Sequence, residues 1–146
     1  MAKFEGSIVI NRPLEEVFEL LSNPENNPKW QSGIVELRKT SEGPIGVGAT
    51  YRSVNQFLGR RIEGETEITE YEPNRKYSEK SKSGPVPFES RATFERVEGG
   101  TRINLEAEAE IGGFFKLAEP LVVSAVRRQL TADLANLKDL MEAHAL

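Results

Sequence analysis

The residues available for chemistry are unusual because the chain contains no cysteine and a single histidine. A Cys–His dyad, a Ser–His–Asp triad or a Cys/His zinc site is therefore hard to build. The histidine, His144, lies close to the C-terminus, where chains often fray, so we do not expect it to be catalytic. Acid–base chemistry would have to depend on Glu, Asp, Tyr, Lys or ordered water.

The strongest acid–base candidate comes from KYSEKSK, residues 76–82. Side chains alternate across a strand, and burying its three lysines would cost several kcal/mol, so Tyr77, Glu79 and Ser81 are predicted to face inward. Burial would raise the pKa of Glu79 and make it a general base, while Tyr51 or Tyr77 polarises a carbonyl. The alternative is that Glu79 lies at an exposed end of the sheet and only binds water.

The neighbouring strands are expected to present aromatic, small and polar side chains to the same interior. This mixture is typical of a small-molecule pocket, because a tightly packed core would avoid the polar groups. In the alternative interpretation, ordered waters satisfy them. The predicted apolar ligand contacts are Trp30, Tyr51, Phe57, Tyr77, Phe88 and Phe94. The predicted polar contacts are Asn55, Glu79 and Ser90. Trp30 would stand at the cavity mouth or, equally well, form a packing plug.

The elements that must position these residues follow from periodicity and turn signals. A first strand over residues 3–11 precedes two short helices, which begin at Pro13 and at Asn23-Pro24. Residues 14, 17, 18 and 21 give the first helix one apolar face. After Gly112-Gly113, apolar residues with helical spacing predict a helix of about 25 residues, kinked or begun by Pro120. The six intervening strands are predicted near 34–41, 49–57, 61–71, 76–83, 88–97 and 101–111.

Charge and composition limit the partners. The 146 residues carry a net charge of -4 and suit one domain, residues 1–146. The chain has no block of basic residues that would indicate nucleic-acid binding. It has no apolar run long enough to span a membrane, so a cytoplasmic location is expected. Neither a cofactor nor a metal is expected. Strand glutamates at 63, 65 and 67 are expected to meet lysines of strand 76–83. Arg127, Arg128 and Asp133 are interpreted as part of a solvated helix face.

Three segments together resemble a known family: SIVINRPLEEVFELLSNPENNPKW, GRRIEGETEITEYEPNRKY and RRQLTADLANLKDLMEA. They are similar to the polyketide cyclase/dehydrase-like branch of the START and birch-pollen-allergen (SRPBCC) superfamily. The resemblance implies an α+β helix-grip fold. A seven-stranded curved antiparallel sheet would grip the long C-terminal helix over a hydrophobic cavity, with two short helices between strands one and two. It carries no catalytic residue onto this chain.

Three functions remain open at this point. The leading hypothesis is binding of a small, mostly apolar molecule such as a polyketide, a quinone or a lipid-like compound. The second is a cyclase or dehydratase that uses Glu79 and a tyrosine. The third is a protein-interaction module resembling chaperone co-activators, which would expose a large apolar patch. Neither the ligand nor the oligomeric state, monomer or dimer, follows from the sequence.

Overall fold

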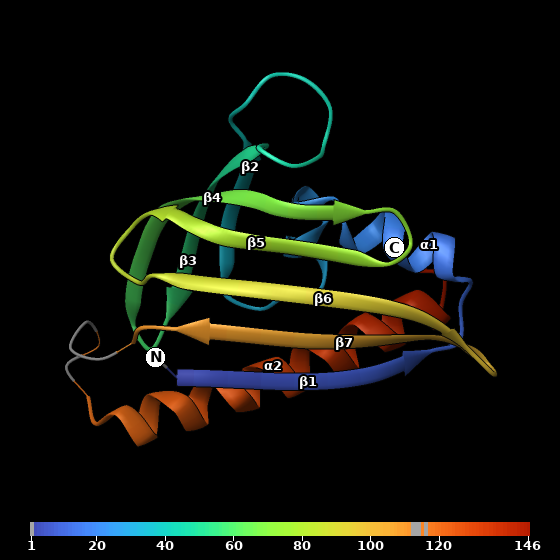
Figure 1. The fold of residues 1–146 in the computed structure, drawn as a ribbon. Coiled ribbons are helices and arrows are strands. Elements are labelled where there is room, and N and C mark those ends of the chain that lie inside the picture. The colour runs from blue at the N-terminus through green and yellow to red at the C-terminus, as the bar shows by residue number, and fades with distance from the viewer. Residues whose placement is uncertain (1, 112–114, 116) are drawn as a thin grey trace.

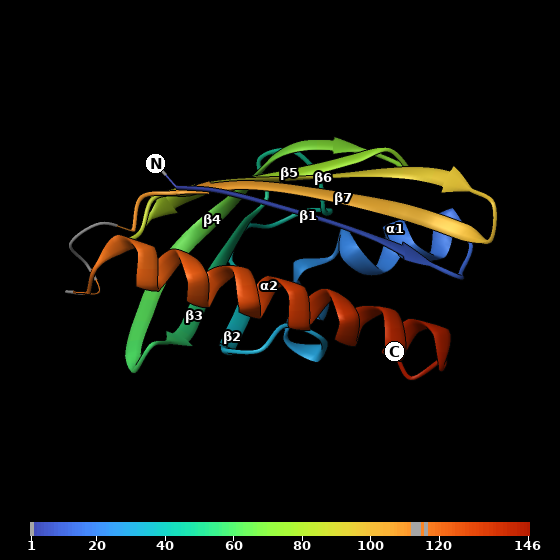
Figure 2. The ribbon, with the colours of Figure 1, turned by 90° about the horizontal axis from the view of Figure 1, so that it is seen from below.

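The protein forms one seven-stranded antiparallel sheet that curves around a long C-terminal helix (Figures 1 and 2). This computed structural model describes all residues except 1, 112–114 and 116, so Gly112-Gly113, after which the long helix is predicted, lies outside the described residues. The strand order is β1-β7-β6-β5-β4-β3-β2. The fold is the predicted helix-grip fold, which confirms that expectation. The elements are β1 (Ala2–Ile10), α1 (Leu14–Leu21), η1 (Pro24–Lys29), β2 (Ile34–Lys39), β3 (Thr50–Phe57), β4 (Arg60–Glu72), β5 (Lys76–Ser83), β6 (Phe88–Val97), β7 (Gly100–Ala109) and α2 (Glu119–Glu142).

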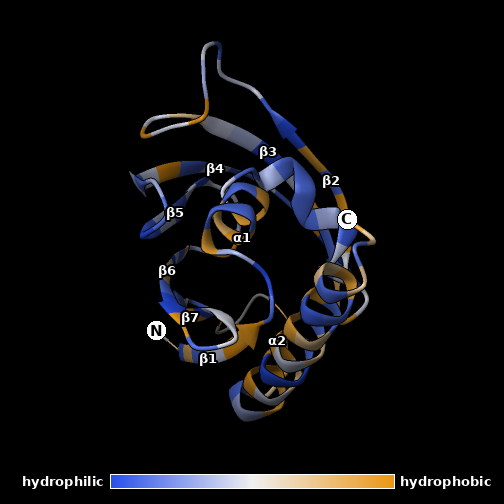
Figure 3. Cartoon of the chain, turned by 90° about the vertical axis from the view of Figure 1, so that its right-hand side faces the viewer, coloured by the Kyte–Doolittle hydropathy of each residue, from blue (hydrophilic) through white to orange (hydrophobic). Residues whose placement is uncertain are grey.

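The break after β1 places two short helices inside the curve of the sheet. Pro13 precedes α1, whose apolar face buries Val17, Phe18 and Leu21. The Phe18 ring makes edge contacts with Phe94 and Tyr71, at centroid distances of 5.0 and 5.6 Å. Figure 3 shows α1 within the concave side of the sheet, between the strands and α2. This helix therefore fills one end of the interior and leaves the other end to be lined by the strands and α2.

Helix α2 lies across the open side of the sheet between the two edge strands (Figures 2 and 3). Pro120 sits in its first turn and marks its beginning, one of the two predicted outcomes. Gly6 lets β1 approach the helix closely, because a Cβ there would meet Leu134 Cδ1 at 3.0 Å. At the C-terminal end, the Lys138 ammonium donates to the Val9 carbonyl at 2.6 Å. These contacts fix α2 over the concave face.

Two irregularities in the β4–β5 pairing, the first with an extra residue in β5 and the second with one in β4, change the side-chain pattern that strict alternation predicts. The β4–β5 register shifts between Glu65 and Thr66 and again between Ile68 and Glu70. After the second shift, Tyr71 pairs with Tyr77, and the two rings make an edge contact at 6.4 Å. A bulge inserts one residue and reverses the faces that follow it. Tyr71 therefore joins the interior and Glu70 lies on the outer face.

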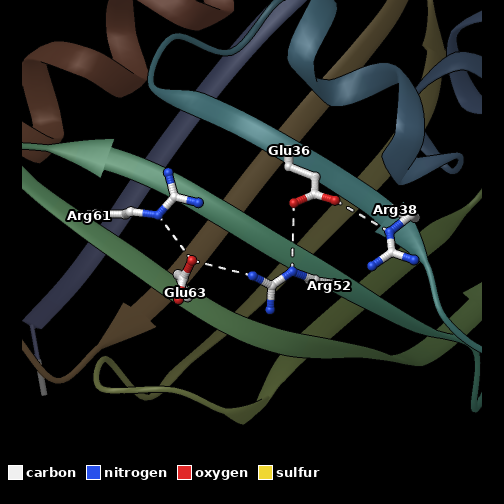
Figure 4. A network of polar contacts seen from close by, with 5 residues as sticks. All are labelled: Glu36, Arg38, Arg52, Arg61 and Glu63. Atoms are coloured by element: carbon white, nitrogen blue, oxygen red, sulfur yellow. Dashed lines mark hydrogen bonds and ion pairs between the residues drawn. The ribbon is translucent and has the colours of Figure 1, made fainter.

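The outer face of the sheet carries an ion-pair network (Figure 4). Arg52 Nη2 lies 3.3 Å from Glu63 Oε1, and Arg52 Nε lies 3.6 Å from Glu36 Oε2; Arg61 and Arg38 extend this chain of contacts at either end. Val54 pairs with Glu36 on one side and Glu63 on the other, and it is fully buried. The long charged side chains thus cover an apolar residue on an otherwise solvated face.

The expected meeting of glutamates and lysines across β4 and β5 is only partly observed. Lys82 Nζ lies 3.7 Å from Glu65 Oε1, and Glu67 is the cross-strand neighbour of Lys80. Glu63 instead pairs with Arg61 and Arg52. The difference arises because β5 ends at Ser83, which pairs with Glu65, so Glu63 has no paired residue on β5.

Candidate functional site

Two adjoining cavities lie between the concave face of the sheet and α2. The large cavity has a volume of about 330 Å³ and the small cavity about 210 Å³. Phe4, Ala107, Leu130 and Asp133 line both of them. Because four residues are shared, the two volumes are neighbouring parts of one interior rather than unrelated surface hollows.

The large cavity is mainly apolar. It is formed mainly where β3, β4, β6 and β7 face the middle of α2, between Val126 and Asp133. Its apolar side chains include Phe57, Ile62, Phe88, Ile111, Phe115 and Val126. Phe57 and Phe115 make an edge contact at 5.5 Å. Polar groups from Asn55 and Gln129 also reach the lining. Such a surface suits a ligand with a hydrocarbon or aromatic body and few polar atoms.

The small cavity lies nearer the C-terminal end of α2. It is lined by Tyr77 and Glu79, the titratable pair that the β5 sequence predicts to face inward. Tyr77 Oη donates a hydrogen bond to Glu79 Oε2 at 3.2 Å. Burial raises the pKa of Glu79, and the hydrogen bond from Tyr77 opposes this only in part. Burial and the neighbouring Glu79 carboxylate likewise raise the pKa of Tyr77. Ser90, which pairs with Glu79 across β5 and β6, lines the same cavity.

Trp30 forms part of the small cavity wall. It follows η1, whose Asn23 cap accepts a hydrogen bond from the Glu25 amide at 3.2 Å, as the Asn-Pro signal predicts. The Trp30 side chain is buried, and among the described residues its Nε1–H has no hydrogen-bond partner. The Asn136 side chain donates to the Trp30 carbonyl at 3.1 Å and ties this segment to α2. Trp30 therefore carries a buried indole donor that is not used by the described residues.

Asp133 is a site residue that sequence reasoning misses. The sequence predicts a solvated helix face for it, but the residue is only 8% exposed. Its Oδ1 accepts hydrogen bonds from the Ser32 amide at 3.1 Å and from the Ser32 hydroxyl at 3.0 Å. Gln129 Nε2 donates to the Ser32 carbonyl at 2.7 Å. The available signal is helical spacing, since position 133 falls on the same face as Leu130, Leu134 and Leu137.

The predicted contacts divide among three places. Asn55, Phe57 and Phe88 line the large cavity, whereas Trp30, Tyr77, Glu79 and Ser90 line the small one. Tyr51 and Phe94 are buried in the core and lie outside the lining of both cavities. Burial, with the negative charges of Glu25 and Glu79, raises the pKa of Tyr51 to about 12.

The absence of a side chain at Gly64 is explained by strand packing and not by space for a ligand. Gly64 lines the large cavity, where a missing side chain would leave room for a ligand. A Cβ at Gly64 would lie 2.5 Å from the Ser83 carbonyl oxygen. The glycine is therefore required by the close approach of β4 and β5. Ala92, Ala107 and Ala109, by contrast, do border cavity space.

Two further features bear on the kind of site. In the part of the chain that the structure describes, no group of His, Cys, Asp and Glu side chains could hold a metal ion. No helix in the described ranges is long and apolar enough to cross a membrane. Neither finding identifies the ligand.

Comparison with known proteins places the fold and the family. Residues 1–142 match the family described as polyketide cyclase/dehydrase and lipid transport. An uncharacterized protein of Mycobacterium tuberculosis is 29% identical over 135 residues, covering 87% of this chain and 79% of that protein. The structure is similar to that of a Thermus thermophilus protein, with a TM-score of 0.83 and 20% identity over 99% of this chain and 100% of the other. A START superfamily protein from Mycobacterium smegmatis gives a TM-score of 0.73 and 14% identity, covering 97% and 95% of the two chains.

Proposed function

We propose that this chain, which belongs to the polyketide cyclase/dehydrase and lipid transport family, binds a small, mostly hydrophobic molecule between its sheet and α2. The observation that carries the proposal is the pair of adjoining cavities, of about 330 and 210 Å³, whose walls are mainly apolar. Ligand pockets commonly have volumes of about 300 Å³ or more and contain a few polar groups that orient the ligand. Polyketides, quinones and lipid-like compounds share these requirements.

The ligand would extend through both cavities. Its apolar body would contact Phe57 and Phe88 in the large cavity, and Asn55 would orient a polar atom there. A second polar end would reach Trp30 and Glu79 in the small cavity. Tyr51 and Phe94 would instead support the wall from the core.

A cavity-filling substitution tests this binding site. Ala107 lines both cavities, so Ala107→Phe should occupy the space between them. Ala135→Phe adds the same ring on an exposed face of α2 and serves as the control. Each protein is titrated with aromatic polyketides, quinones and fatty-acid derivatives, and Trp30 emission and thermal unfolding are followed together. We expect saturable binding in the wild type and the control, and at least about tenfold weaker binding in Ala107→Phe.

Two results would count against the proposal. One is the absence of saturable binding across all three ligand classes. The other is unchanged affinity in an Ala107→Phe variant that unfolds at the wild-type temperature, because a filled cavity cannot hold the same ligand in the same place.

A cyclase or dehydratase activity is the second candidate, and the Tyr77–Glu79 pair favours it. A carboxyl group with a raised pKa is a stronger base when ionised, and a neighbouring phenol can stabilise charge on a substrate oxygen. Product analysis after incubation with a bound polyketide separates carrier from enzyme. If Glu79 is the general base, Glu79→Gln should abolish turnover while ligand affinity stays within a few-fold of the wild type.

A protein-interaction module gains less support. The large apolar side chains that are exposed among the described residues belong to separate segments, including Val35 in β2, Leu58 at the β3–β4 turn and Leu121 in α2. Copurification of a stoichiometric protein partner without a small molecule would favour this function instead.

A further inference from the structure

Among the residues that the structure describes, the cavity walls contain acidic groups but offer no cation to a ligand. Asp133 lines both cavities and is 8% exposed. Among the described residues that line the large cavity, no lysine, arginine or histidine occurs. Arg91 is the only cationic residue in the described lining of the small cavity, and its guanidinium pairs with Glu70 at 2.7 Å. Glu70 lies on the outer face of the sheet, so Arg91 is directed away from the interior.

An anionic ligand head would therefore meet an unfavourable field. A carboxylate that leaves water needs a cation or several hydrogen-bond donors to offset its lost hydration. The Asp133 carboxylate would repel it, and the two hydrogen bonds from Ser32 are already used by Asp133. The charge distribution thus disfavours free fatty acids and other carboxylates.

The small cavity does offer donors to a neutral acceptor. Trp30 lines this cavity, and its buried Nε1–H lacks a partner among the described residues. The Glu79 carboxyl, when protonated, has one O–H to donate, and burial favours that form by raising its pKa. A buried donor without an acceptor costs about 1–3 kcal/mol, so a ligand that supplies the acceptor recovers part of this cost.

Building on the proposed function, we propose that the small cavity receives an uncharged ligand head that accepts hydrogen bonds, a carbonyl or a hydroxyl. The Trp30 indole N–H donates to this head, and Asp133 excludes a carboxylate of the same chain length. The hydrocarbon body of the ligand occupies the large cavity. The head group, rather than the apolar body, then decides which lipid-like compounds the protein accepts.

A series of matched ligands tests this assignment on the wild-type chain. Undecan-2-one, undecan-1-ol and undecanoate have eleven carbons each and differ in the head. Binding is measured by calorimetry at pH 8, where the ligand carboxylate is ionised, and below the micellar concentration. We expect the ketone and the alcohol to bind at least about tenfold more tightly than undecanoate.

Two variants assign the selectivity to named groups. Asp133→Asn keeps an oxygen that accepts from Ser32 but removes the charge, so undecanoate affinity should rise several-fold while ketone affinity is unchanged. Asp139→Asn makes the same charge change on an exposed position of α2 and should alter neither. Trp30→Phe keeps an aromatic ring without the donor, so ketone affinity should fall several-fold while undecanoate affinity does not.

The outcomes separate this inference from the proposed function. If undecanoate binds as tightly as the ketone, the head-group assignment is wrong and the apolar site still stands. If none of the three compounds binds, the head-group assignment fails, and the titrations with polyketides and quinones still decide the proposed function. Unchanged undecanoate affinity in a folded Asp133→Asn variant would overturn the role of Asp133, and equal losses for all ligands in Trp30→Phe would overturn the role of Nε1. The wild-type ligand series decides the selectivity even if a variant does not fold.

Discussion

Replacing Tyr51 by phenylalanine removes one oxygen atom from the centre of the core. Tyr51 is fully buried, and among the described residues its hydroxyl has no hydrogen-bond partner. A buried hydroxyl without a partner costs about 1–3 kcal/mol, and part of this is recovered when the oxygen is deleted. Allowing for the small space that the oxygen leaves, Tyr51→Phe should raise the free energy of unfolding at pH 7 by about 1 kcal/mol.

The same substitution at Tyr77 should have the opposite effect. Tyr77 Oη donates to Glu79 at 3.2 Å, so Tyr77→Phe leaves a buried carboxyl without its partner. We expect the free energy of unfolding to fall by about 1 kcal/mol. Both variants are compared with the wild type by urea unfolding, where a common slope shows that the unfolded states are alike. For a chain of this size, each change corresponds to about 2–4 °C in melting temperature.

Alkaline pH gives a second measurement on Tyr51. Its folded-state pKa of about 12 lies above the value of about 10 expected in the unfolded chain. The folded state therefore holds this proton more tightly, and the contribution to stability is fully present below pH 10 and is lost as pH rises towards 12. Tyr51→Phe should lose less stability than the wild type over this range. Tyr77, whose pKa is also raised, accounts for a remaining slope.

A destabilised Tyr51→Phe protein at pH 7 would refute this reasoning. It would mean that the hydroxyl has a partner in solution, such as a buried water that makes several hydrogen bonds. An unchanged alkaline profile would show separately that the phenol is not held protonated by its surroundings.

Three further substitutions test other parts of the structure. Glu79→Gln should gain stability relative to the wild type as pH rises above about 4.5, because the raised folded-state pKa of Glu79 gives a contribution that is present below the unfolded value and lost above it. Glu70→Gln should show the opposite slope, since hydrogen bonds from Ser78 and Arg91 lower the pKa of Glu70 to about 2. The contribution of Glu70 to stability is therefore lost as pH falls from about 4.5 towards 2. Unfolding at several pH values between about 2.5 and 8 checks both glutamate variants, and profiles parallel to the wild type would contradict these predictions. Asn23→Ala removes the η1 cap and should lower the free energy of unfolding by about 1 kcal/mol in urea, with no loss if the cap does not form in solution.

Local rules predict most of the fold because charge and periodicity agree along the strands. The lysines of residues 76–82 determine which face of β5 turns inward, and the Tyr77–Glu79 hydrogen bond lies on that face. The same rules do not predict the shift between Ile68 and Glu70, because a bulge satisfies the curvature of the whole sheet and not a preference of its own residues. The inward position of Tyr71 follows from that shift and is therefore not predictable from alternation.

Asp133 shows a different limit of sequence reasoning. A charged residue on an amphipathic helix is usually solvated, and only its position beside Leu130 and Leu134 hints at burial. Its burial depends on Ser32, which lies 101 residues away and supplies two donors. The same contact joins the segment after Trp30 to α2, so the group that sets the cavity's charge also holds its wall. A ligand that drew the Asp133 oxygen away from Ser32 would therefore loosen that wall, whereas Asp133→Asn, which keeps an accepting oxygen, should leave it in place.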